Sequence, residues 1–264
     1  MHPAESLIEQ IERKNQKIFT NYLDQIFSLV WLPSHNRQHH DRVWHFTKEI
    51  LLAYLHKGAT FSHDFIEALM LAVYFHDTGL TRTLSAKHGF ESASITKDFL
   101  ANQWQRSNRY EHEMLDAIVR HDEKDYALVQ EGESVIPTIY SILTVADDLD
   151  AFGAVGLIRY LEIYCLRKIE NNQLKPAILG NLESRFAFVN LMFAPLPALS
   201  AIHEVRYQVA CELLKEMDEH DLSFLQQQID KKVDLLDFST FKYHHSSVLI
   251  KAFKHVVEEM NYFH

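Results

Sequence analysis

Residues 62–79 read SHDFIEALMLAVYFHDTG and predict one central helix over about residues 62–77. Ser62 is a favourable N-cap residue for that helix. Every residue from Ala68 to Phe75 is apolar or aromatic. A helix that is hydrophobic nearly all round is normally buried on all sides. It ends at His76-Asp77, and Gly79 then allows the chain to turn away sharply.

The sequence on both sides of this segment also has the apolar spacing of helices. The first expected helix, residues 5–30, has apolar positions at Leu7, Ile8, Ile11, Ile18, Tyr22, Ile26 and Leu29. Further helices are expected over 39–55, 87–104, 109–121, 137–150, 155–175, 198–218 and 244–262. Seven Gly and six Pro in 264 residues are too few for the many tight turns of a β-sandwich or barrel. The expected fold class is therefore all-α.

The composition limits the possible partners. With 47% hydrophobic and 12% aromatic residues, the chain has enough apolar side chains for a large core. The net charge of −10 argues against a nucleic acid polymer as partner, because phosphate backbones would be repelled. We expect no membrane partner, because no apolar run of about 18 residues is present. Two cysteines, Cys165 and Cys211, and no visible signal peptide predict buried, reduced thiols in a cytoplasmic protein.

The pair His76-Asp77 ends the most apolar helix, so burial of its side chains would require a positive partner. The negative end of the helix dipole also favours a cation at this position. For an isolated pair, the more common alternative is an ordinary helix end with a neutral His and an exposed Asp. Because the chain contains 17 histidines, other ligands for a metal are available.

Two other segments supply such ligands. His39 lies one turn before Val43 on the same face of its helix, so it is expected to point inward. Its neighbour His40 is rotated by about 100° and is expected to be solvated or to lie behind the ligands. Asp147 lies near the core-facing side of an apolar helix, where a buried carboxylate requires positive charge. The alternative for each is a solvated surface residue, although an acidic cluster at a helix C-terminus is disfavoured by the dipole.

In this order, His39, His76-Asp77 and Asp147 resemble the ligand set of the HD superfamily of metal-dependent phosphohydrolases. Residues 146–156, ADDLDAFGAVG, are similar to the Ala-Asp-x-Leu-Asp-Ala-x-Gly-Ala-x-Gly segment of bacterial HD-domain hydrolases. The resemblance covers about residues 33–160. It implies an HD-domain, phosphodiesterase-like helical bundle, with an N-terminal helix at 1–32 packing on it. Residues 161–264 would form a C-terminal helical extension of the same globule and a possible homodimer contact.

The resemblance also implies roles for individual residues. His35, in His35-Asn36-Arg37-Gln38-His39, is similar to the proton-donating His of cyclic-nucleotide phosphodiesterases, although Ser34 replaces the usual preceding Tyr. His88 and His121 are similar to the ligands of a second ion. The expected catalytic residues are Asp77, His35 and Asp150. The residues expected to bind substrate phosphate are Lys87, Arg42 and Arg120. The expected metal ligands are His39, His76, Asp77, Asp147, His88 and His121.

The implied activity is metal-assisted hydrolysis of a phosphate ester in a small substrate such as a nucleotide or cyclic nucleotide. One or two divalent ions would be required, and this ligand set suits Mn, Fe, Co, Ni, Zn or Mg. Two alternatives remain open. One is a di-iron oxygenase of the same fold, similar to inositol oxygenase, and the other is a regulatory module that binds a nucleotide or metal without turnover.

Overall fold

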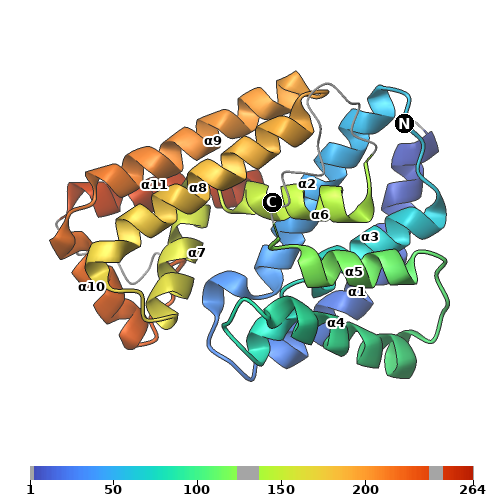
Figure 1. The fold of residues 1–264 in the computed structure, drawn as a ribbon, viewed down its shortest axis with the longest axis horizontal. Helices are drawn as coiled ribbons and strands as arrows, with labels where there is room; N and C mark the ends of the chain where they lie inside the picture. Colours follow the sequence, from blue (N-terminus) through green and yellow to red (C-terminus); the bar gives the residue numbers. More distant parts are fainter. Residues whose placement is uncertain (1–2, 124–136, 238–245, 264) are drawn as a thin grey trace. The chain divides into compact units, whose positions relative to one another are not determined.

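The structure, a computed structural model, describes residues 3–123, 137–237 and 246–263. All the regular secondary structure within these ranges is helical, so the predicted all-α fold class is confirmed (Figure 1). The chain divides into two compact units. The first consists of Met1–Val30 and Asn36–Asp147, and the second of Trp31–His35 and Asp148–His264.

The first unit is built around helix α3, His63–Phe75. Every residue of α3 from Phe65 to Phe75 is buried, and the Ser62 hydroxyl caps the helix by accepting the Phe65 backbone N–H at 3.2 Å. Burying one large apolar side chain contributes about 1.5–3 kcal/mol, so the apolar surface of α3 strongly favours this central position. The predicted central helix is confirmed. It packs against α1 (Pro3–Phe27), α2 (Arg37–His56), α4 (His88–Phe99) and α5 (Glu111–Arg120).

Helix α1 is present as predicted, but part of its predicted apolar face is wrong. Ile18 is 37% exposed and Leu29, beyond the end of α1, is 82% exposed. Asn15 interrupts the apolar pattern, yet it is buried and its Nδ2 donates to Glu67 Oε1 at 3.3 Å. A buried polar residue that bonds to α3 therefore interrupted the apolar pattern in the sequence. The buried positions of α1 are Ile8, Ile11, Asn15, Phe19, Thr20, Leu23 and Phe27.

Gly79 is required by close packing. It lies in the 3₁₀ helix η2 (Thr78–Thr81) and does not have a positive φ. A Cβ at this position would lie 2.0 Å from the backbone oxygen of His88. The backbone at Gly79 and the first turn of α4 can therefore approach each other only because residue 79 has no side chain.

The second unit has its own central helix, α7 (Gly153–Leu166), whose residues from Gly153 to Cys165 are all buried. It packs against four other helices and against the short 3₁₀ helix η1 (Pro33–His35). The four are α8 (Asn171–Phe193), α9 (Pro197–Glu216), α10 (Glu219–Asp230) and α11 (Ser247–Tyr262). The sequence prediction did not identify residues 176–193 of α8 or any of α10. The first two residues of the helix expected over 244–262 lie outside the described residues.

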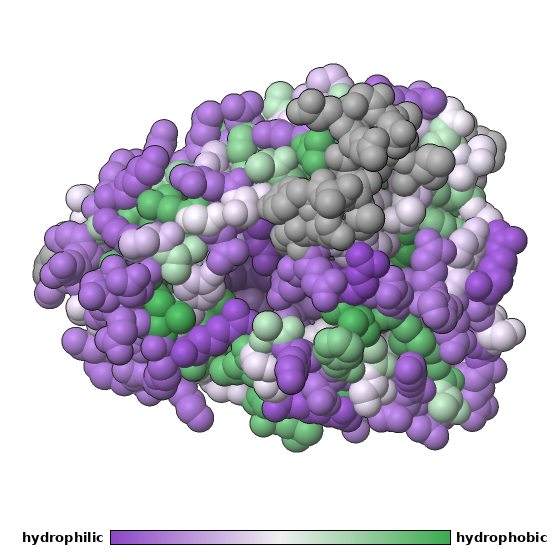
Figure 2. All heavy atoms as spheres, in the orientation of Figure 1, coloured by the Kyte–Doolittle hydropathy of each residue, from purple (hydrophilic) through white to green (hydrophobic). Residues whose placement is uncertain are grey.

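The surface in Figure 2 is mostly hydrophilic, with apolar side chains in small separate groups. Cys165 and Cys211 are buried and form no disulfide, as the sequence predicted, and burial raises the pKa of the Cys165 thiol to about 12. Within the described ranges, no helix combines the length and the apolar character needed to cross a bilayer.

Candidate metal centre

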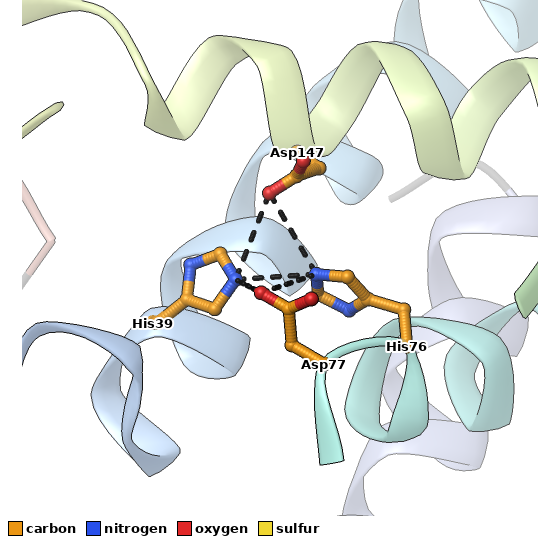
Figure 3. A group of neighbouring side chains, drawn as sticks. All are labelled: His39, His76, Asp77 and Asp147. Carbon is orange, nitrogen blue, oxygen red and sulfur yellow. Dashed lines mark hydrogen bonds and ion pairs between the residues drawn. The ribbon is translucent and has the colours of Figure 1, made fainter. Parts of the chain in front are cut away.

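Four of the predicted ligands meet inside the first unit, and all four are buried (Figure 3). His39 lies in the first turn of α2, whose start is fixed by the Asn36 side chain accepting the Gln38 N–H at 2.9 Å. His76 and Asp77 directly follow the last residue of α3. Asp147 lies on helix α6 (Ile139–Asp150) and points toward the other three.

The four side chains bring nitrogen and oxygen atoms close to a common point, which we call centre A. The Nε2 atoms of His39 and His76 are 3.1 Å apart. Asp147 Oδ1 is 3.6 Å from each of these nitrogens. Asp77 Oδ2 is 3.4 Å from His39 Nε2 and 3.7 Å from His76 Nε2.

A second group, centre B, consists of Asp77, His88 and His121. The Nε2 atoms of the two histidines are 3.2 Å apart. Asp77 Oδ1 is 3.1 Å from His121 Nε2 and 3.2 Å from His88 Nε2. One oxygen of Asp77 therefore faces centre A and the other faces centre B, so the two groups share this carboxylate.

Three of the histidines have the same local geometry. His76, His88 and His121 each have Nδ1 within 3.0 Å of the backbone oxygen three residues earlier. A carbonyl oxygen only accepts hydrogen bonds, so Nδ1 must carry the proton in each ring. In a neutral imidazole this leaves a lone pair on Nε2, the atom that faces the centre. The oxygens belong to Val73, Ser85 and Ile118.

These arrangements fit a divalent cation. Ligand atoms about 2.0–2.2 Å from one ion lie roughly 3–3.6 Å from one another, and the separations here are close to that range. Facing imidazole lone pairs repel unless a proton or a metal ion lies between them. Hydrogen bonds from ligand histidines to backbone oxygens are also the usual second layer of such sites.

The electrostatics of these side chains support the same conclusion. Burial by itself raises the pKa of Asp77, but His76 and hydrogen bonds from the other histidines hold that pKa well below its usual range. Burial lowers the pKa of His88, yet Asp77 raises it to about 9. A proton on His88 therefore balances the Asp77 carboxylate, and a metal ion at centre B would displace this proton.

Two predicted catalytic residues belong to the second unit and have partners there. His35 Nδ1 lies 3.0 Å from Ser34 Oγ and 3.5 Å from Glu162 Oε1. Asp150 is buried, and its Oδ2 pairs with Arg159 at 2.9 Å. The proton-donor role of His35 and the catalytic role of Asp150 remain predictions.

The three predicted phosphate-binding residues lie in different surroundings. Lys87 is exposed and immediately precedes His88 at the start of α4. Arg120 pairs with Asp116 at 3.2 Å. Arg42 is only 3% exposed. Lys87 is therefore the most accessible of the three to a substrate.

Of the two expectations for His40, a solvated side chain is wrong, because His40 is fully buried and lies next to His39 and His76. Sequence reasoning also missed Asp122, whose Oδ2 is 3.4 Å from His88 Nε2 on the more exposed side of centre B. Its position directly after His121 was the available signal.

Sequence reasoning also assigned no role to three arginines around the C-terminal end of α6. Arg185 and Arg159 pair with the two other acids of this end, Asp148 and Asp150. Arg206 donates to the backbone oxygen of Leu149 at 2.7 Å. For Arg159, the available signal was its place in the apolar segment 151–166, where Glu162 is the only other charged residue.

Comparison with known protein families, with curated proteins and with solved structures found no match for this chain. The fold and the site together define an all-helical protein with buried histidine and aspartate clusters that could hold metal ions.

Proposed function

We propose that this protein is a metal-dependent phosphohydrolase with an HD-type site. The observation that carries the proposal is the shared Asp77, whose two oxygens face two different pairs of imidazole nitrogens. Two ions held a short distance apart by a bridging carboxylate are a recurrent arrangement in enzymes that displace groups at phosphorus.

The side chains of the two centres would hold the ions, and Lys87 would bind the substrate. Bound divalent ions would supply a nucleophile from water near neutral pH and draw charge from a phosphoryl oxygen. His39, His76 and Asp147 would hold one ion, and His88 and His121 the other, with Asp77 on both. Because these six side chains are buried, the ligands stay fixed in position and bulk water is limited. Lys87 would contribute a charge-assisted hydrogen bond to substrate phosphate.

The test is phosphate release from a panel of nucleotides, cyclic nucleotides and simple phosphate esters, with added Mn²⁺, Co²⁺ or Mg²⁺. We expect metal-dependent release that is lost in Asp77→Ala. Release that does not depend on metal, or that survives in Asp77→Ala, would contradict the proposal.

A di-iron oxygenase is a second candidate, because the same six side chains could also hold iron. Four imidazoles and two carboxylates suit iron as well as the other first-row metals. Iron in the purified protein, with oxygen consumption and no phosphate release, would favour the oxygenase. Ligand binding without either reaction would instead indicate a regulatory module.

A further inference from the structure

His40 is a buried imidazole beside centre A that the proposed function does not use. It follows His39 on α2 and is fully buried. Its ring centroid lies 5.1 Å from those of both His39 and His76. It belongs to neither group of side chains that could hold an ion.

The polar contact of His40 is with a backbone oxygen that already serves a ligand. His40 Nδ1 lies 3.0 Å from Val73 O, and His76 Nδ1 lies 2.8 Å from the same atom. Because a carbonyl only accepts, both rings donate to it. Val73 is in the last turn of α3, where backbone oxygens lose their donors within the helix.

The other ring nitrogen of His40 makes burial of this side chain unfavourable for the stability of the fold. His40 Nε2 is buried and has no hydrogen-bond partner among the residues that the structure describes. A buried polar atom without a partner is destabilising, and an apolar side chain would avoid that penalty. The hydrogen bond to Val73 O is therefore the feature of His40 that an apolar residue of similar size could not replace.

We propose that His40 is a positioning residue for His76, acting through the carbonyl of Val73. This inference rests on the metal centre of the proposed function. A carbonyl oxygen has two lone pairs, and here one serves His76 and the other serves His40. With both occupied, the direction of the carbonyl is fixed, and with it the orientation of the His76 ring toward centre A.

The same arrangement is not repeated at centre B. The Nδ1 atoms of His88 and His121 bond to separate carbonyls, those of Ser85 and Ile118. No hydrogen bond from a second imidazole to either carbonyl is found within the described ranges. The effect of His40 is therefore specific to centre A.

Three substitutions separate positioning from space filling. His40→Phe fills the volume and removes the donor, and His40→Ala removes both. His40→Asn keeps an amide N–H at about the position of Nδ1. The matched control is His45→Phe on the same helix, where the side chain is only partly buried and pairs with Glu49 at 3.5 Å.

The measurement is a Co²⁺ titration followed by absorption, with circular dichroism to confirm folding. Each variant is also titrated in a His121→Ala background, so that centre A is observed with centre B impaired. We expect His40→Phe and His40→Ala to weaken cobalt binding at centre A about 10- to 100-fold. His40→Asn should recover most of that loss, and His45→Phe should bind as the unaltered protein does.

Wild-type cobalt affinity in folded His40→Phe would overturn the inference, as would a loss in His40→Asn equal to that in His40→Phe. An equal loss at both centres would also overturn it, because that result would indicate general damage. So would a wild-type protein that binds no cobalt. Cobalt binding without phosphate release would reject the phosphohydrolase and leave the role of His40 intact.

Discussion

The two oxygens of Asp77 face different imidazole pairs. Single substitutions should therefore affect metal binding at one centre or at both, depending on the residue. Asp77→Ala should lose ions from both centres, because it removes a ligand from each. Asp147→Ala should lose the ion of centre A alone, and His121→Ala that of centre B alone. Metal content per chain, measured by elemental mass spectrometry on purified protein, checks these stoichiometries.

The control for that series is Asp64→Ala, which removes an acid from the exposed first turn of α3, the helix that His76 directly follows. It should retain the full metal content. Full metal retention in Asp77→Ala would exclude Asp77 as a ligand.

The sequence was sufficient to predict which side chains gather at centre A but not all of their surroundings. His39, His76, Asp77 and Asp147 could be predicted because side chains able to bind metal interrupt or end apolar helices. The contact of His40 with the backbone oxygen of Val73 could not be predicted, because it depends on how the end of α3 packs against α2. Helical periodicity predicts which residues share a face of one helix. It does not predict which backbone oxygen of a neighbouring helix a side chain will contact.

Among the helical elements, α4 depends on Gly79 for its position. The missing Cβ leaves room for the His88 backbone oxygen, and the His88 side chain is one of the three that form centre B. Gly79→Ala should therefore destabilise the protein by about 1–3 kcal/mol, the usual cost of overpacking, and should weaken centre B more than centre A. Denaturant unfolding and metal titration measure the two effects.

Gly180→Ala is the matched control, because a Cβ there would meet no atom within 4 Å and the residue lies within α8. This change should be neutral or stabilising by up to about 1 kcal/mol, since Ala favours helix more than Gly does. Equal destabilisation by the two substitutions would contradict the packing argument.

Helices with a clear apolar pattern could be predicted, and those without one could not. Helix α3 was evident because it is apolar on every side. Helix α8 contains Pro176, which normally argues against a helix interior. The start of helix α10 is marked by a capping box between Asp218 and Asp221. Its position is therefore signalled by local hydrogen bonding more than by its few buried residues.

At the level of the whole chain, metal binding should increase the thermal stability of the protein. An ion that binds only the folded protein at 100 times its dissociation constant stabilises it by about 2.7 kcal/mol. We therefore expect Mn²⁺ or Co²⁺ to raise the melting temperature and a chelator to reverse the shift. Differential scanning calorimetry measures this, with Asp77→Ala as the variant whose melting temperature should not respond.

The division into two compact units depends on pairings between distant segments that a linear pattern does not contain. Residues 31–35 belong with residues 148–264, although more than one hundred residues separate them. Glu162 on α7 accepts the Ser34 backbone N–H, with 3.2 Å to its Oε2. A buried acid and a buried amide on distant segments cannot be paired from the sequence alone.

The use of backbone oxygens at Val73, Ser85 and Ile118 has a consequence for sequence variation at these positions. Every amino acid, proline included, carries the same carbonyl group. A substitution at any of these three positions therefore keeps the carbonyl oxygen that accepts the hydrogen bond from the histidine. Selection on this part of the site would act on backbone shape, so a comparison of related sequences could show variable residues at the atoms that orient the ligands.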